Sequence, residues 1–152
     1  MHKFLFLDFD GVLHPDGEPD FCRRELFEQY LLAMPEVRIV ISSTWREDYP
    51  LPALRNIFCP SLQDRILGVT PVLEVGFDRG GRQREIEAWL SSWDMQGRPY
   101  VWVALDDWRP FFDEICPELI LVDACTGFRE QDGQQLLSWY QGVSGNQTRG
   151  AV

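Results

Sequence analysis

Short apolar runs alternate along the chain with segments whose apolar residues recur at helical spacing. The apolar runs are four to six residues long, as in buried strands, and cover residues 3–8, 37–41, 66–69, 100–105 and 119–122. The segments with apolar residues three or four positions apart cover residues 23–33, 51–58, 82–93 and 133–140. Strands that alternate with helices predict βαβ units, and therefore a three-layer α/β fold around a mostly parallel five-stranded sheet.

The length of the chain predicts one domain followed by a short tail. At 152 residues the chain suits a single domain, which we place at residues 1–141. Residues 142–152 are rich in Gly, Ser, Asn and Thr, which predicts a flexible tail. No apolar run reaches the length of a membrane span, the first residues lack a signal peptide's apolar region, and the four cysteines show no CxxC spacing. These features predict a soluble, cytoplasmic protein with reduced thiols.

Two pairs of aspartates follow two of the predicted strands. Asp8 and Asp10 stand at and just past the end of the first strand, where Gly11 permits a sharp turn, and Asp106 and Asp107 follow the fourth. Because right-handed crossovers bring the carboxyl ends of parallel strands to one edge, we expect these acids to meet. Carboxylates so close together repel one another, which predicts a divalent cation between them. An isolated Asp-x-Asp-Gly is also an ordinary turn signal, so the first pair alone decides nothing.

Hydroxyl and guanidinium groups are expected at the same edge of the sheet. Ser42 and Ser43 follow the second strand, and Arg82 and Arg84 lie in the first turn of a helix that two glycines precede. Hydroxyls and arginines hold phosphate oxygens, and the N–H groups at a helix start attract anions. Hard oxygen ligands in this number suit Mg²⁺, which keeps waters or a substrate phosphate in its coordination shell. Together these residue types predict a Mg²⁺-dependent phosphate-binding site at this edge of the sheet.

Several residues near these motifs have simpler interpretations. Trp45 and Arg46 are placed to shape the mouth of the site, but Trp45 fits core packing equally well. Asp123 fits a loop acid or a cap better than a ligand. His14, beside a proline, fits a surface loop residue.

The order of these motifs resembles that of the haloacid dehalogenase-like (HAD) phosphohydrolase superfamily, and the resemblance continues to about Phe128. The stretch LFLDFDGVL matches the first motif of the superfamily, a hydrophobic strand followed by DxDGxL, and VALDD matches the acidic pair. The resemblance implies that Asp8 is the nucleophile and a metal ligand, and that Asp10 is the general acid/base. It also implies that the backbone carbonyl of Asp10 binds Mg²⁺, together with Asp106 or Asp107.

The other two motifs of the superfamily contribute groups that bind the substrate phosphate. RIVISSTWRE offers Ser42, with Ser43 as the alternative, and GRQREIEAWL offers Arg82, with Arg84 as the competitor. A receiver-like domain also gathers acids at such an edge, but it requires a lysine after a late strand. Lys3 is the only lysine in this chain, which argues against a receiver.

The resemblance also bears on the substrate. Larger members carry a cap domain soon after the first motif or between the second and third. Here both stretches are too short for a large cap, which implies an open site. Capless members often act on phosphates of macromolecules or on terminal phosphates, and this chain looks most like the small HAD domains associated with RNA-repair proteins. Its net charge of −10 excludes a broad basic surface, so nucleic acid is expected only as a substrate.

We therefore expect a Mg²⁺-dependent phosphohydrolase that cleaves a phosphomonoester, on a small molecule or a macromolecular end, through an aspartyl-phosphate. The alternative is a regulatory module that binds metal or phosphate on the same fold without turnover. The intact pair of Asp8 and Asp10 favours the enzyme, because a module without turnover has no mechanistic need for both acids.

Overall fold

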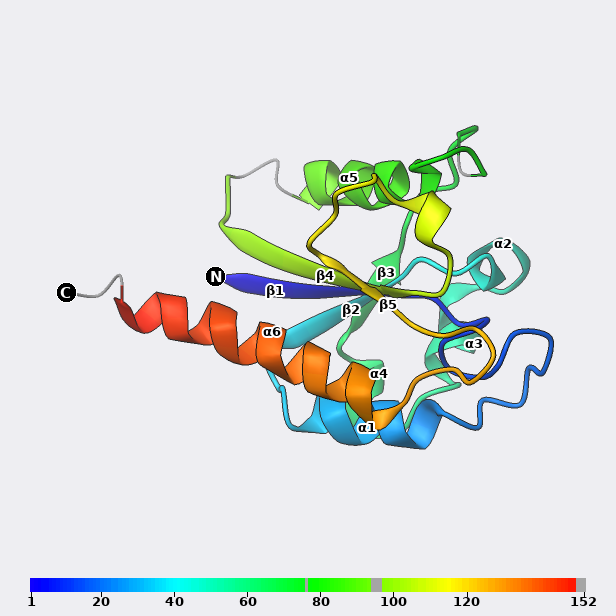
Figure 1. The fold of residues 1–152 in the computed structure, drawn as a ribbon, viewed down its shortest axis with the longest axis horizontal. Coiled ribbons are helices and arrows are strands. Elements are labelled where there is room, and N and C mark those ends of the chain that lie inside the picture. The colour runs from blue at the N-terminus through cyan, green and yellow to red at the C-terminus, as the bar shows by residue number, and fades with distance from the viewer. Residues whose placement is uncertain (76, 94–96, 150–152) are drawn as a thin grey trace.

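The computed structural model describes residues 1–75, 77–93 and 97–149, and its five strands form one parallel sheet (Figure 1). The strands are β1 (His2–Leu7), β2 (Val37–Ile41), β3 (Ile66–Val69), β4 (Tyr100–Asp106) and β5 (Leu119–Leu121). They lie in the order β3-β2-β1-β4-β5, and each neighbouring pair is parallel. The predicted α/β class and the predicted five-stranded sheet are confirmed.

Helices connect the strands and cover both faces of the sheet. They are α1 (Arg24–Leu32), α2 (Trp45–Asp48), α3 (Leu51–Arg55), α4 (Pro60–Gln63), α5 (Gly81–Trp93), the 3-10 helix η1 (Arg109–Phe111) and α6 (Glu130–Arg149). In Figure 1, α5 lies on one face of the sheet, while α1 and α6 lie together on the other. This gives the three layers that the sequence predicted. Within the described ranges, no helix combines the length and apolar character needed to cross a membrane.

Alternate residues of the central strands fill two separate cores. Leu5 and Leu7 of β1 belong to the larger core, which α1 and α6 cover, whereas Phe4 and Phe6 belong to the smaller core beneath α5. All four side chains are buried. A strand that is buried on both faces has no polar side, which explains why these strands read as continuous apolar runs rather than as alternating ones.

Two helical segments differ from the sequence-based expectation. The helix predicted over 51–58 ends early, at Arg55, and a further turn that was not predicted, α4, begins at Pro60. A proline disfavours helical geometry at the residue before it, so a new helix starts at the proline instead of continuing the old one. The single turn of α2 was not predicted, since four residues are too few to show a helical period.

The last helix, α6, extends well beyond the segment predicted over 133–140. It begins at Glu130, where Oδ2 of Asp132 accepts a hydrogen bond from the backbone N–H of Arg129 at 2.8 Å. It then continues through Gly142 and Gly145 to Arg149, into the stretch predicted as a tail. Residues 150–152 lie outside the described part of the chain. The division at residue 141 and the flexibility of the tail stay predictions.

The register of the three central strands decides where their carboxyl ends lie. Leu7 of β1 pairs with Ile41 of β2 on one side and with Leu105 of β4 on the other. The ladder continues one step further, because Asp8 N–H donates to the carbonyl of Leu105 at 3.1 Å and Ser42 N–H donates to that of Leu7 at 3.0 Å. The three strands therefore end at one level, and the residues that follow them begin side by side.

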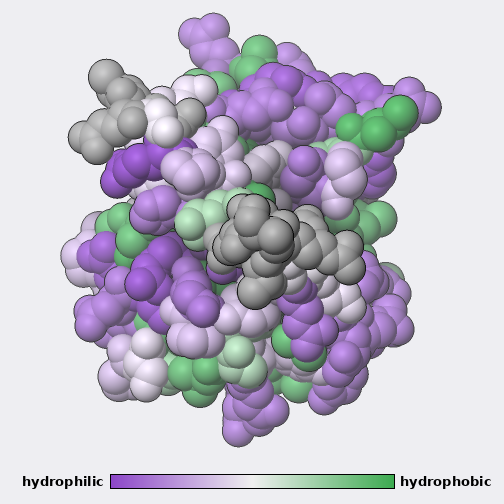
Figure 2. Space-filling view, turned by 90° about the vertical axis from the view of Figure 1, so that its left-hand side faces the viewer, coloured by the Kyte–Doolittle hydropathy of each residue, from purple (hydrophilic) through white to green (hydrophobic). Residues whose placement is uncertain are grey.

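The opposite end of the molecule, which carries the N-terminus and the end of α6 (Figure 1), is largely hydrophilic. Figure 2 shows this face, where apolar side chains are scattered among polar ones. Scattered apolar residues are normal on a protein surface and need no functional explanation. The chemistry-bearing residues predicted from the sequence instead follow the carboxyl ends of the strands.

Candidate active site

Three carboxylates meet at the carboxyl edge of the sheet. Asp8 follows β1, Asp106 ends β4 and Asp107 comes next, and one carboxylate oxygen of each lies within 4.8 Å of the others. Asp8 and Asp106 are buried, and Asp107 is half-buried. Three of the four aspartates expected at this edge therefore form one cluster, which we call the acid cluster. The carboxylate of the fourth, Asp10, has other partners.

Gly11 allows the chain to pass close to the acid cluster. Its φ of +77° lies in the left-handed region, which glycine adopts without steric cost. A Cβ at this position would lie 2.3 Å from Oδ2 of Asp107, well inside contact distance. The glycine expected from a turn signal thus also provides the space that the Asp107 carboxylate occupies.

Burial and mutual repulsion make the acid cluster hard to ionise. Burial, and then the charge of Asp106, raises the pKa of Asp8 well above its ordinary value. Burial also raises the pKa of Asp106 to about 7 and that of Asp107 above its usual range. Oδ2 of Asp106 is buried without a hydrogen-bond partner among the described residues. A divalent cation would offset this repulsion and take up that oxygen, and three hard carboxylate ligands fit Mg²⁺.

The carboxylate of Asp10 is held apart from the acid cluster by two side chains. Its Oδ1 forms a 2.7 Å hydrogen bond with Nε2 of His14. The indole N–H of Trp45 donates to both of its oxygens, at 3.1 Å each. Asp10 itself is half-buried, so its carboxylate has two fixed partners and remains accessible to solvent. The site therefore holds two kinds of acid in two different surroundings.

The partners of Asp10 correct one sequence interpretation and resolve another. His14, interpreted as a surface loop residue, is fully buried, and its ring packs edge-on to Phe21 at 4.8 Å. Trp45 both packs and binds, because its ring stacks on Tyr49 while its N–H reaches Asp10. Asp123, interpreted as a loop acid, accepts a hydrogen bond from the backbone N–H of Cys125 within its own loop.

Of the two candidate arginines, the structure brings Arg82 to the acid cluster. Arg82 is buried, and its Nε lies 3.8 Å from Oδ2 of Asp106. Its guanidinium also lies over the ring of Phe111, with 5.1 Å to the centroid. Arg84 is half exposed and pairs instead with Glu87 and Asp113. The two arginines are two residues apart, and two steps of about 100° each send them to different sides of α5.

The two candidate serines are both buried where β2 ends. Ser42 continues the ladder beside Asp8, as its N–H bonds to Leu7. Oγ of Ser43 accepts a hydrogen bond from the backbone N–H of Trp45 at 3.3 Å, at the start of α2. The hydroxyl of Ser43 thus already has a local structural partner.

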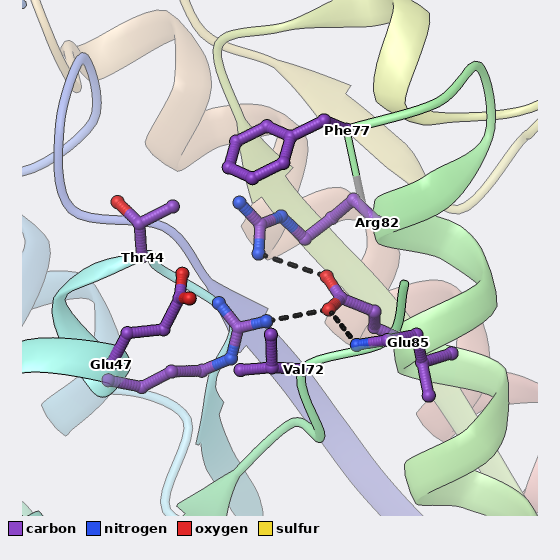
Figure 3. Close-up of a pocket in the computed structure, with 8 residues that line it drawn as sticks. Thr44, Glu47, Val72, Phe77, Arg82 and Glu85 are labelled. Carbon is purple, nitrogen blue, oxygen red and sulfur yellow. Dashed lines mark hydrogen bonds and ion pairs between the residues drawn. The ribbon is translucent and has the colours of Figure 1, made fainter. Parts of the chain in front are cut away.

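A small pocket lies beside the acid cluster, between α2 and the start of α5 (Figure 3). Its cavity volume is about 20 Å³, which is room for about one water molecule. Its lining residues come from the loops that follow β2 and β3 and from α5: Thr44, Arg46, Glu47, Val72, Leu73, Phe77, Arg82 and Glu85. In Figure 3 the guanidinium of Arg82 extends into the space between Phe77 and Glu85. The pocket therefore places a cation next to the carboxylates.

The fold and this arrangement agree with the comparison to protein families. A family model described as the HAD domain in Swiss Army Knife RNA repair proteins matches residues 4–132. The chain belongs to this HAD family. The matched range includes every residue placed at the site above. Among curated proteins and among solved structures, no significant match was found. Membership makes the chain a phosphohydrolase-like HAD domain, and HAD domains generally use Mg²⁺, in agreement with the acid cluster.

The sequence of this HAD domain did not indicate which side chains hold its predicted site residues in place. These are His14 and Trp45, which bind Asp10, and Glu85, which binds Arg82. One signal was present for Arg82 and Glu85. They lie four and one positions before Ile86, on the stripe that carries the apolar residues of α5, so helical spacing alone places them on its buried side. Arg84 falls off that stripe.

Proposed function

We propose that this HAD domain is a Mg²⁺-dependent phosphohydrolase that cleaves phosphomonoesters through an aspartyl-phosphate on Asp8. The observation that carries the proposal is the separation of the acids. Asp8, Asp106 and Asp107 share one buried cluster, whereas Asp10 is held outside it by His14 and Trp45. Two carboxylates in different surroundings can take different roles, one as nucleophile and one as general acid/base.

The first half of the reaction forms the covalent intermediate. An oxygen of Asp8 bonds to phosphorus while the bond from phosphorus to the leaving oxygen breaks, and Asp10 gives that oxygen its proton. Arg82 and the hydroxyl of Ser42 hold the phosphoryl oxygens; Ser43 is the weaker candidate because its hydroxyl already binds Trp45 N–H. A Mg²⁺ held by Asp8, the Asp10 carbonyl and Asp106 or Asp107 would supply neutralising charge for the phosphate and the acids.

The second half releases phosphate. Asp10, now deprotonated, takes a proton from a water whose oxygen attacks phosphorus, and the bond between phosphorus and Asp8 breaks. The hydrogen bonds from Trp45 and His14 keep the Asp10 carboxylate in place for both proton transfers. The products are the free alcohol and inorganic phosphate, and Asp8 returns to its carboxylate form.

The proposal is tested with an aryl phosphate, assayed with Mg²⁺ and with a chelator. We expect turnover only with the metal, and an adduct of beryllium or aluminium fluoride on Asp8 that mimics the phosphorylated enzyme. Binding of Mg²⁺ and of the fluoride complex without turnover on any phosphomonoester would instead support the alternative of a non-catalytic regulatory module. Turnover that is unchanged in the chelator would contradict the metal-dependent proposal.

The two arginines of α5 give a matched test of the phosphate contact. Arg82→Gln is expected to lower kcat/KM roughly 100-fold, as loss of one transition-state donor commonly does, because it removes the buried guanidinium beside the acid cluster. Arg84→Gln, from the opposite side of the same turn, should change kcat/KM less than about 2-fold. Steady-state kinetics of both variants test which arginine contacts the phosphate. An equal loss of kcat/KM in both variants would refute the assignment to Arg82.

We propose further that the substrate is a nucleotide or the phosphate end of an RNA, met in the cytoplasm. The family's description as part of RNA repair proteins supports this. The short stretches between the motifs, which predict an open site without a large cap, agree with it. Phe77, which lines the pocket beside Arg82 (Figure 3), is 81% exposed, and its ring makes only a tilted contact with Phe111, with 6.5 Å between the centroids. The net charge of −10 disfavours long contacts with a polyanion, so a contact limited to the end of the strand fits better.

A stacking role for Phe77 predicts a substrate-dependent effect. Stacking of a base on an aromatic side chain is worth about 1–3 kcal/mol. Phe77→Ala is therefore expected to raise KM for a 3′-phosphorylated oligoribonucleotide roughly 5-fold or more. KM for glycerol phosphate, which has no ring, should stay unchanged. Parallel KM measurements test this, and an equal rise for both substrates would show that Phe77 shapes the pocket rather than stacking on a base.

A further inference from the structure

A buried glutamate, Glu85, joins two buried arginines beside the acid cluster (Figure 3). Its Oε2 accepts hydrogen bonds from Nη2 of Arg46 at 2.8 Å and from the backbone N–H of Leu73 at 3.0 Å. Its Oε1 accepts one from Nη1 of Arg82 at 3.3 Å. Glu85 thereby links three segments that surround the site: the single turn α2, the loop after β3 and the start of α5.

Arg46 has no donor left for a ligand. A guanidinium carries five N–H donors, and each of those of Arg46 has an acceptor within hydrogen-bond distance. The acceptors are Glu85 and the backbone carbonyls of Ser42, Ser43, Thr70 and Pro71. Arg46 is therefore an anchor. It ties the loop that carries the two serines to the loop after β3, and it fixes one side of the Glu85 carboxylate.

In contrast to Arg46, Arg82 has a buried N–H donor without an acceptor among the described residues. It binds Glu85 through Nη1, while its buried Nε has no hydrogen-bond partner among the residues that the structure describes. That nitrogen lies 3.8 Å from Asp106, too far for a hydrogen bond. Most of its donors therefore remain available beside the acid cluster. Without a counter-charge behind it, a buried guanidinium would move onto the nearest carboxylate, which here is a candidate metal ligand.

We propose that Glu85, fixed by Arg46 and Leu73, is a positioning residue that holds the Arg82 guanidinium back from Asp106. Arg82 then keeps its N–H donors for the phosphoryl group, and Asp106 keeps Oδ2 for the metal, while its Oδ1 accepts a hydrogen bond from the backbone N–H of Trp108 at 3.0 Å. Glu85 does not touch the substrate. The inference rests on the proposed function, in which Arg82 binds the phosphoryl group.

The same helix carries a matched control. Arg84 and Glu87 form the same arginine–glutamate pair with the same spacing of three residues. In that pair the side chains are 42% and 43% exposed, whereas those of Arg82 and Glu85 are 4% and 2% exposed. Glu85→Gln and Glu87→Gln therefore make the same chemical change in the same helix, once beside the site and once on the surface.

The first experiment measures kcat/KM on an aryl phosphate together with the Mg²⁺-induced rise in melting temperature. Glu85→Gln is expected to lower kcat/KM roughly 10- to 100-fold, the cost of a misplaced catalytic contact, and to require a higher Mg²⁺ concentration for half of the melting-temperature rise. Glu87→Gln should match the wild type in both. Equal behaviour of Glu85→Gln and the wild type would overturn the proposal.

A double variant tests whether Glu85 acts through Arg82. If it does, Arg82→Gln/Glu85→Gln will be no slower than Arg82→Gln alone, because there is no guanidinium left to position. Fully additive losses would show an independent structural role and overturn the proposal. Should Glu85→Gln fail to fold, Glu85→Asp replaces it. Glu85→Asp keeps the charge but is one methylene shorter, so it cannot reach all three donors, and the same loss is expected.

Binding of inorganic phosphate separates this inference from the proposed function. Calorimetry with Mg²⁺ present should show weaker phosphate binding in Arg82→Gln and in Glu85→Gln, and unchanged binding in Glu87→Gln. If the wild type lacks turnover but shows this pattern, the proposed reaction fails while the positioning role stands. If the wild type is active and Glu85→Gln binds phosphate normally, the positioning role fails alone.

Discussion

Asp8→Asn is expected to lower kcat by at least about 1,000-fold, because loss of a covalent nucleophile commonly costs this much or more. The amide nitrogen and neutral oxygen that replace the carboxylate cannot form the aspartyl-phosphate. The same change removes one of three buried, mutually repelling acids. The metal-free variant should therefore melt at the same temperature as the wild type or higher, so that loss of activity and loss of folding are separated. Kinetics and thermal unfolding measure the two effects.

The control for Asp8→Asn is Asp64→Asn, an exposed residue at the end of α4. It makes the same chemical change away from the site, and its kcat should stay within about 2-fold of the wild type, as surface substitutions usually are nearly neutral. A phosphoenzyme that still forms in Asp8→Asn would assign the nucleophile to another residue. A lower melting temperature of Asp8→Asn in the chelator would argue against repulsion within the acid cluster.

The metal-free protein is expected to lose stability as pH rises from about 5 to about 8, opposite to the usual behaviour of acids in proteins. Burial raises the pKa of Asp106 from 3.8 to about 7 and raises that of Asp8 as well. The native state therefore holds protons that the unfolded chain has already released. Because stability falls with pH wherever the native state binds more protons, this contribution is complete below about pH 4 and is lost as pH passes through about 7.

Magnesium should remove most of this pH dependence. With chelator, we expect the melting temperature at pH 8 to lie roughly 5 °C or more below that at pH 5.5. With Mg²⁺, the value at pH 8 should rise, because the ion binds the ionised acids of the native state alone. Asp106→Asn, which cannot titrate at this position, should flatten the chelator curve. A curve of Asp106→Asn as steep as that of the wild type would assign the pH dependence to groups other than Asp106, with Asp8 as the next candidate.

The strands could be predicted from the sequence because their signal is local. The side chains of β1 enter two cores on opposite faces of the sheet, so the whole run must be apolar. One core receives Leu5 and Leu7, and the other receives Phe4 and Phe6. The boundaries of helices were harder to predict. The break between α3 and α4 and the extension of α6 past Gly142 depend on packing and on the balance of small local preferences.

Within the site, the sequence predicted which residue types gather at the edge but not their partners. Both Arg82 and Arg84 fit the basic motif at the helix start. Spacing from Ile86 places Arg82 on the buried stripe of α5, but only the packing of α5 on the sheet brings its side chain to Asp106. The role of His14 was missed for the same reason. Its burial beside Asp10 depends on Phe21 and Trp45, the latter more than thirty residues away in the chain.

The sequence by itself thus determined the α/β architecture, the family, and the meeting of aspartates at the carboxyl edge of the sheet. These follow from periodicity and from the handedness of crossovers, which are properties of short segments and of their order. Only the tertiary structure decided how close Arg82 lies to the acids, which side chains hold the Asp10 carboxylate, and how Glu85 and Arg46 connect the loops. Those contacts depend on strand register and helix rotation to within a few ångströms, and they join residues distant in the chain, so no local pattern encodes them.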